Sequence, residues 1–265
     1  IRLLLIALAI IIPSVFGVFM LRQIAHQTPL PPSLLPPRGE SPFVFATGDA
    51  AVAPPFSRQA YEATFLLGDR IIPTVEVRPT RDRVWVLYSN EPLERWTTGT
   101  GPIEKQNWSD LAALQWQGSA PGGLLRLQEF MDSFRPQKLM VIVHSREVPA
   151  AASVVAILGA REEPEVTFIF SPHHRLNREL RKKRPRWFGG GDSTILAQWH
   201  VFAAIGLEPF VPMDFEWYFR GGPWGRTKPF APSVETELER RHLGQILVLD
   251  QDPLPLSWSH LYGVL

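Results

Sequence analysis

The sequence contains no cysteine, which excludes disulfide bonds, thiolate metal sites, iron–sulfur clusters and a cysteine nucleophile. It also has almost no net charge, because 27 lysines and arginines are balanced by 26 aspartates and glutamates. Such a chain has no overall attraction to nucleic acid, although local charge clusters still act. No dinucleotide fingerprint or phosphate-binding loop follows an apolar run. Residues 189–191 are all glycine but lack the Lys-Ser/Thr context of a phosphate-binding loop.

Proline and tryptophan are abundant, with 26 and 9 residues respectively in a chain of 265. The proline content is twice the ordinary fraction of about 5%. Hydrophobic residues make up 45% of the chain, so it can bury a core and is not a disordered polymer. The length fits one large domain or two small ones.

Residues 3–21 form an uncharged, apolar run bracketed by Arg2 and Arg22. As a helix this run is about 28 Å long, close to the thickness of a bilayer core. We therefore expect a membrane anchor over residues 1–24. A cleavable signal peptide is the alternative, but its apolar region is ~7–15 residues long and a small-residue cleavage site follows it. A buried soluble helix is the third interpretation.

The segment after the anchor is rich in proline and reads TPLPPSLLPPRGESP from residue 28 to residue 42. Prolines favour a stiff, extended spacer without packed structure. We predict a linker over residues 25–42 and a globular domain over residues 43–265. The charges that flank the anchor are equal and do not decide its orientation. A short tail before an uncleaved anchor favours a single-pass protein with its domain on the extracytoplasmic side.

Apolar, β-rich runs alternate with helical periodicity throughout the globular part. Strands are expected at residues 43–46, 71–77, 84–88, 139–143, 166–170, 208–211, 246–249 and 262–265. Helices are expected at residues 57–67, 124–134, 150–158, 176–183, 195–204 and 234–241. This alternation predicts an α/β fold, namely a TIM (β/α)₈ barrel with parallel strands preceded by one transmembrane helix. A doubly wound sheet is the alternative.

The stretch from residue 45 to residue 114 resembles the glycerophosphodiester phosphodiesterase family. It begins FATGDAAVAPPF, continues through PTRDRVWVLYSNEPLER and TTGTG, and ends in NWSDLAAL. The family has A-H-R-G, then E-x-D, then H-D-P and T-N-G-T-G at the corresponding places. Farther on, VETELERRHLGQILVLDQDP resembles its late segment. The resemblance implies a TIM barrel that hydrolyses phosphodiesters with Ca²⁺ or Mg²⁺.

The resemblance also places the family's site positions on this chain, and most of them have changed. The aligned residues are Ala46 and Thr47 for His-Arg, Thr74 and Glu76 for E-x-D, Ser89 and Asn90 for His-Asp, and Ile142 and His144 for E-x-K. Of the acidic metal ligands, only Glu76 remains acidic, and one carboxylate does not make a site for a hard divalent cation. We therefore expect no catalytic residue, metal or cofactor at the mouth, and Glu76 either solvated or paired with a basic group. The alternative is a different register in which other residues replace the site.

Two further clusters attract attention. His173 and His174 follow an expected strand, but no carboxylate is close in sequence, which favours a helix start over a metal site.

A basic run and an aromatic stretch at 210–224 predict a surface for anionic lipid or a protein partner, with a solvated helix face and an internal lid as alternatives. The residues assigned to this surface are Arg178, Arg181, Lys182, Lys183, Arg184, Arg186, Trp187, Phe215, Trp217, Tyr218 and Trp224.

Three functions remain open at this point. The first is a catalytically degenerate, membrane-anchored accessory subunit of a larger membrane complex, with the bilayer and other subunits as partners and no role for nucleic acid. The second is an active phosphodiesterase acting on lipid-derived glycerophosphodiesters through a rearranged site. The third is a module that binds phosphodiesters without hydrolysing them.

Overall fold

The computed structural model describes residues 17, 44–48, 52–68, 71–89, 91–117, 122–160, 166–184, 186–204, 207, 215–220, 236–238, 240, 244–248 and 261–264. The linker, the strand expected at 208–211 and, apart from the helical Gly17, the predicted anchor lie outside these residues. Among the helices in the described ranges, none has the length and apolar character needed to cross a bilayer.

Helices and strands alternate along the described chain, as the sequence predicts. The strands are β1 (Val44–Ala46), β2 (Ile71–Pro79), β3 (Trp85–Leu87), β4 (Lys138–Val143), β5 (Val166–Phe170), β6 (Phe188–Gly191), β7 (Trp217–Arg220), β8 (Gly244–Val248) and β9 (Leu261–Val264). The α-helices are α2 (Arg58–Phe65), α3 (Trp108–Leu111), α4 (Leu127–Phe134), α5 (Ala150–Leu158), α6 (His174–Lys183) and α7 (Ser193–Ala204). Short 3₁₀ turns lie at Leu93–Arg95 and Ile103–Lys105.

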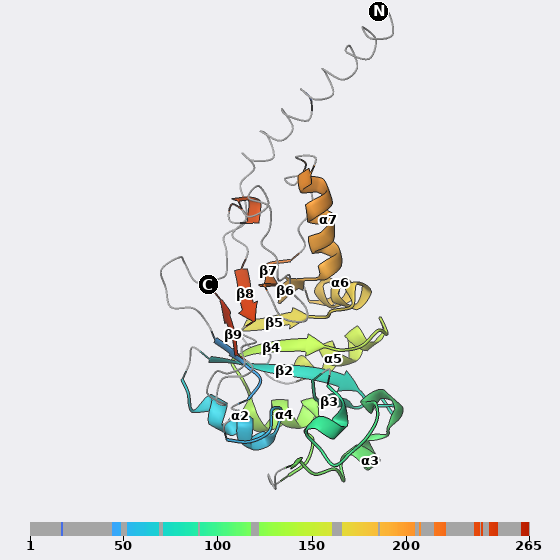
Figure 1. Cartoon of the computed structure of the whole chain (residues 1–265). Helices are drawn as coiled ribbons and strands as arrows, with labels where there is room; N and C mark the ends of the chain where they lie inside the picture. Colours follow the sequence, from blue (N-terminus) through green and yellow to red (C-terminus); the bar gives the residue numbers. More distant parts are fainter. Residues whose placement is uncertain are drawn as a thin grey trace, which may run out of the picture.

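The strands pair into a closed ring. Figure 1 shows β2, β4 and β5 side by side in it. β1, β2, β4, β5, β6, β7 and β8 are parallel neighbours in that order. β9 closes the ring by pairing antiparallel with both β8 and β1. Two expectations are corrected here. β3 is not a barrel strand but the antiparallel hairpin partner of β2, and the last strand is antiparallel rather than parallel.

Two strands that the sequence pattern did not predict complete the ring. β6 consists of Phe188 and three glycines, a composition with low strand propensity. The glycines are needed because a Cβ on Gly190 would lie 2.8 Å from the rings of Phe170 and Trp217. β7 lies inside the stretch interpreted as a contact loop, because its aromatic residues face the core rather than a partner.

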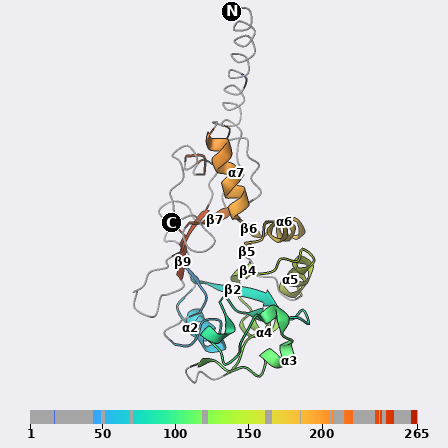
Figure 2. The same ribbon diagram turned by 45° about the vertical axis from the view of Figure 1, so that its right-hand side comes forward.

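The barrel wall separates an inner apolar core from two outer ones, of which the smaller packs α7 against β7. Aromatic rings fill the interior, where Phe168 packs edge-on against Phe45 at 5.1 Å and stacks on Phe188 at 5.0 Å between centroids. The rings of Trp217 and Phe219 lie 5.0 Å apart in the same core. The larger outer core lies between the strands and helices α2, α4, α5 and α6. Figure 2 shows α5 and α6 next to one another outside the strands, and α7 at the end of the molecule opposite α3.

Candidate functional site

The alternation of side chains along β2 and β4 determines which residues reach the mouth of the barrel. Ile72, Met140 and Ile142 belong to the inner core, whereas Val75, Val141 and their neighbours belong to the outer one. Because successive strand residues point to opposite faces, Thr74, Glu76 and His144 also point inward. Glu76 lies in the carboxyl-terminal half of β2 and His144 directly follows β4, so both are at the end of the strands where sites form in TIM barrels.

Glu76 and His144 form a buried pair at this mouth. Nε2 of His144 lies 2.7 Å from Oε2 of Glu76, and both side chains are about 5% exposed. The backbone N–H of His144 donates to the carbonyl of Val77 at 2.9 Å, which fixes the histidine beside β2. Glu76 thus pairs with a basic group, one of the two outcomes that the sequence predicts. The sequence did not identify the partner, since 68 residues separate the two.

Glu76 also acts on a neighbouring tyrosine. Tyr61 of α2 is fully buried and donates its hydroxyl to the carbonyl of Thr74 at 2.8 Å. Burial raises the pKa of Tyr61, and the negative charge of Glu76 raises it further. Tyr61 is therefore a neutral hydrogen-bond donor at physiological pH, and it joins α2 to the strand that carries Glu76.

The remaining aligned positions supply hydroxyl and apolar groups. Thr47, directly after β1, and Thr74 are buried, and neither hydroxyl has a hydrogen-bond partner within the described part of the chain. Ala46 is buried and apolar, and Ile142 lies opposite Glu76 in the sheet register. The carbonyl of Ser89 accepts from Arg78, whose guanidinium also binds Glu104 at 2.6 Å. Asn90 lies outside the described residues.

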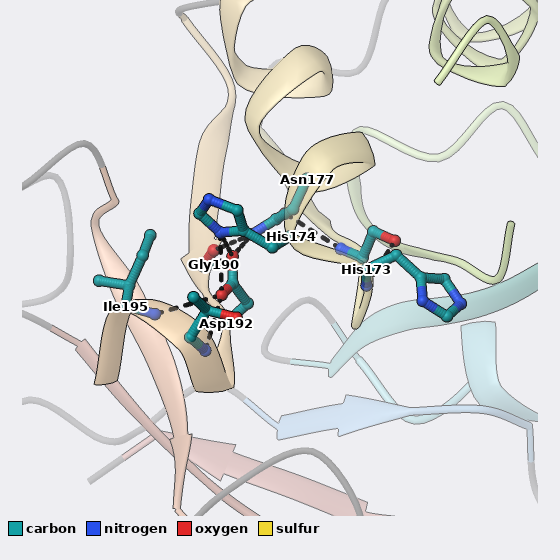
Figure 3. A network of polar contacts seen from close by, with 8 residues as sticks. His173, His174, Asn177, Gly190, Asp192 and Ile195 are labelled. Carbon is teal, nitrogen blue, oxygen red and sulfur yellow. Dashed lines mark hydrogen bonds and ion pairs between the residues drawn. The ribbon is translucent and has the colours of Figure 1, made fainter. Parts of the chain in front are cut away.

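A second polar network joins the ends of β5 and β6, and Figure 3 shows it. Asp192 is fully buried directly after β6, and its carboxylate accepts from the backbone N–H groups of Thr194 and Ile195, so it caps α7. The same carboxylate lies 3.0 Å from Nδ1 of His174 and accepts from Asn177 at 3.2 Å. Asp192 is therefore the N-cap of α7 and also contacts the imidazole at the start of α6, so it links the first turns of the two helices.

Sequence reasoning missed Asp192. The available signal was an aspartate followed by Ser-Thr before an apolar helix, because Asp is a preferred N-cap residue. The predicted start of this helix at residue 195 was two residues late.

The two adjacent histidines point in different directions, as Figure 3 shows. His174 turns toward Asp192, whereas His173 turns away from it and lies within the electrostatic influence of His144 and Arg146. Burial is the main cause that lowers the pKa of His173, and the positive charges of Arg146 and His144 add to it. His173 precedes the first residue of α6, which confirms a helix start at this place.

The residues at the mouth do not fit the divalent cation that the resemblance implies. Ca²⁺ and Mg²⁺ need several oxygen ligands, and carboxylates supply most of the binding energy. Glu76 is bonded to an imidazole, and its register neighbour Ile142 is apolar. In the described ranges, no three His, Asp or Glu side chains are grouped so that they could hold a metal ion.

The structure separates the predicted contact surface into buried and exposed parts. Its buried members pack within the domain, and this corrects their assignment to a surface: Arg181, Trp187, Phe215, Trp217 and Tyr218. Arg184 is half-buried and lies over the ring of Trp187 at 5.9 Å. The exposed members are Arg178, Lys182, Lys183 and Arg186. Trp224 lies outside the described residues.

Comparison of sequences identifies no relative: no protein-family model and no curated protein matches this chain. Solved structures do match, and phosphodiesterases are among them. A phosphodiesterase of Oleispira antarctica, in complex with the product sn-glycerol-3-phosphate, matches with a TM-score of 0.63 at 15% identity, over 80% of this chain and 86% of that one. A glycerophosphodiester phosphodiesterase of Agrobacterium tumefaciens matches with a TM-score of 0.58 at 17% identity, over 80% and 87%. One from Parabacteroides distasonis matches with a TM-score of 0.55 at 17% identity, over 79% and 72%.

Proposed function

We propose that this chain, which has the glycerophosphodiester phosphodiesterase fold, is a membrane-anchored accessory subunit that does not catalyse metal-dependent hydrolysis of phosphodiesters. The observation that carries the proposal is the buried pair of Glu76 and His144. Hydrolysis on a divalent cation requires Glu76 as a free ligand with other carboxylates around it. Here the carboxylate is bonded to an imidazole and its neighbours are a threonine and an isoleucine.

The sequence that precedes the barrel supports the accessory role. Residues 3–21 are long and apolar enough for one membrane span, and the proline-rich segment that follows is a spacer. A barrel that keeps its packing but not its metal ligands can still act as a rigid scaffold to which other proteins bind. We therefore propose a single-pass membrane protein with its domain on the extracytoplasmic side and other subunits as partners.

A second candidate function is hydrolysis by the chain's own acid–base groups. Glu76 and His144 form a pair of the kind that transfers protons in many active sites. The pKa of His173 is lowered, first by burial and then by the charges of Arg146 and His144, which favours the neutral imidazole that can accept a proton. This candidate needs no metal, and it predicts that His144 and His173 are both essential.

A hydrolysis assay of the full chain distinguishes the two. The substrates are glycerophosphocholine and glycerophosphoethanolamine, with Ca²⁺, with Mg²⁺ and with a chelator. The accessory role predicts no turnover above a Glu76→Ala/His144→Ala control under any condition. Turnover that depends on the cation and disappears in Glu76→Ala overturns it, and turnover in chelator that disappears in His144→Ala or His173→Gln establishes the second candidate.

Purification from the native membrane in mild detergent then tests the partners. The accessory role predicts that a defined set of membrane proteins accompanies the chain in constant ratio. A chain that purifies alone, and whose unfolding temperature rises with glycerophosphocholine, is instead a phosphodiester-binding module.

A further inference from the structure

The end of the barrel opposite the mouth carries exposed apolar side chains. The segment between α2 and β2 leaves Leu66 88% exposed and Leu67 52% exposed, and Phe65 is 38% exposed beside them. These residues follow the end of α2 and precede the start of β2, so they lie at the amino ends of the parallel strands. Exposed leucines grouped with an aromatic residue are typical of a contact surface.

A cavity of about 280 Å³ opens beside these side chains. Its lining comes from the α2–β2 and α4–β4 connections, including Phe65, Ile71, Phe134 and Lys138. The rings of Phe65 and Phe134 stack at 5.1 Å with an angle of 10° between their planes. The two rings therefore connect the α2–β2 and α4–β4 connections across the cavity, and Arg135 is exposed at its edge.

Basic side chains lie at the same end of the barrel. α6 runs from the carboxyl end of β5 back to the amino end of β6, so its last residues lie opposite the mouth. Lys182, Lys183 and Arg186 are exposed there. Within the described residues, the ion pair of this group is that of Lys182 with Glu179, at 3.7 Å. The acidic Glu216, at the start of β7, accepts from the backbone N–H of Gly189. The sequence also has glutamates at 162, 163 and 165, outside the described residues.

β1, the strand that follows the linker in the sequence, begins at this end too. Val44, the first residue of β1, pairs with Ile71, and the N–H of Ile71 donates to the carbonyl of Gly68. Leu66 and Leu67 thus lie one turn from the strand pair at which the chain arrives from the proline-rich segment. Only 22 residues separate the apolar run that ends at residue 21 from Val44. At about 3.1 Å per residue, these 22 residues limit the distance between this end of the domain and the apolar run to about 68 Å.

We propose that the amino end of the barrel docks on an anionic phospholipid bilayer, with Leu66 and Leu67 entering the interface and Lys182, Lys183 and Arg186 contacting lipid headgroups. Apolar side chains that enter the interface and basic side chains beside anionic lipid both favour the docked state. This inference rests on the anchoring part of the proposed function. It directs the mouth, with Glu76 and His144, away from the membrane.

The test uses the full chain in lipid nanodiscs of phosphatidylcholine, with and without phosphatidylglycerol. The absence of natural cysteine allows one nitroxide label at Leu67→Cys and, as a matched control, at Arg146→Cys beside the mouth. Collisions with oxygen report lipid, and collisions with a nickel chelate report water. Docking predicts an oxygen-dominated signal at residue 67 in anionic discs and a nickel-dominated signal at residue 146 in both kinds of disc.

Charge variants identify the contact. Lys182→Gln/Arg186→Gln lowers the ratio of docked to undocked domain about fivefold for each charge removed. Arg175→Gln/Arg178→Gln removes the same charge from the mouth-side half of α6 and has a smaller effect. Equal effects overturn the proposed orientation.

Different outcomes overturn membrane anchoring and docking of the domain. A chain that does not enter the discs lacks the anchor, which overturns the anchoring and the docking together. A chain that enters while its residue-67 label stays accessible to nickel overturns docking alone. A residue-67 label shielded from oxygen and nickel alike reports a protein contact and overturns the lipid assignment.

Discussion

The two ends of the barrel differ in which side chains they bury and which they expose. At the carboxyl end, the buried carboxylates of Glu76 and Asp192 are bonded to the imidazoles of His144 and His174. At the amino end, Leu66 and Leu67 are exposed, and the exposed Lys182, Lys183 and Arg186 lie at the same end of the barrel. A barrel that hydrolyses its substrate on a cation is expected to keep free carboxylates inside its mouth. Here Glu76 is paired with His144 and the exposed leucines lie at the opposite end, which favours a role in contact over a role in hydrolysis.

The largest loss of folding stability is expected when an apolar side chain inside the barrel, and not one at its amino end, is truncated. Trp217 is fully buried among the interior rings, so Trp217→Ala should destabilise the domain by about 3–5 kcal/mol. Leu66→Ala, at an exposed position, should change the stability by less than about 0.5 kcal/mol. Urea unfolding followed by fluorescence measures both. A Leu66→Ala variant as unstable as Trp217→Ala would mean that Leu66 is a core residue rather than a contact.

Breaking the pair at the mouth should cost almost as much. His144→Leu leaves the Glu76 carboxylate buried without its imidazole, and a stranded charge of this kind costs about 3–5 kcal/mol. Glu76→Leu/His144→Leu removes both partners and should be more stable than His144→Leu alone. The same unfolding experiment provides the comparison. A double variant less stable than His144→Leu would indicate that the two side chains do not depend on one another.

A smaller loss is expected at Asp192. Asp192→Ala removes the N-cap of α7 and the partner of His174, and a lost cap costs about 0.5–2 kcal/mol. Asp192→Asn keeps an oxygen acceptor for the helix and serves as the matched control, with a smaller loss. Hydrogen exchange of the first turn of α7 locates the effect. Equal exchange in the alanine variant and the natural protein would remove the capping role.

The smallest effect concerns pH. The pKa of His173 is lowered in the folded protein, chiefly by burial, whereas an unfolded histidine titrates near about 6.5. Below that pH the unfolded chain holds more protons than the folded one, so stability rises with pH through this window and levels off above it. His173→Gln should reduce this rise, as measured by unfolding free energies on either side of about pH 6.5. An unchanged pH dependence would contradict the burial of the imidazole.

Local patterns in the sequence predicted most of the elements but not how they pair. β2, β4 and β5 are apolar runs and α2 and α5 have helical periodicity, so each was predicted within a few residues. The antiparallel direction of β9 depends on contacts with β1 and β8, which no local pattern contains. β6 was missed because its glycines make space for interior rings that come from elsewhere in the chain.

The site was predictable only in part, for a related reason. The resemblance located Glu76 and His144, since each occupies a motif position at the end of a strand. Their partnership follows from the parallel pairing of β2 and β4 and was not foreseen. The aromatic residues at 215–218 read as a contact surface because sequence alone does not distinguish exposed from buried rings, and the barrel interior accommodates Trp217.

The Glu76 carboxylate is bonded to the His144 imidazole, and we expect it to bind no metal ion. Calorimetric titration of Ca²⁺ and of Mg²⁺ into the full chain, beside Glu76→Ala, tests it most directly. The account predicts the same negligible heat for both proteins with both cations. Saturable binding by the natural chain that is lost in Glu76→Ala would contradict it.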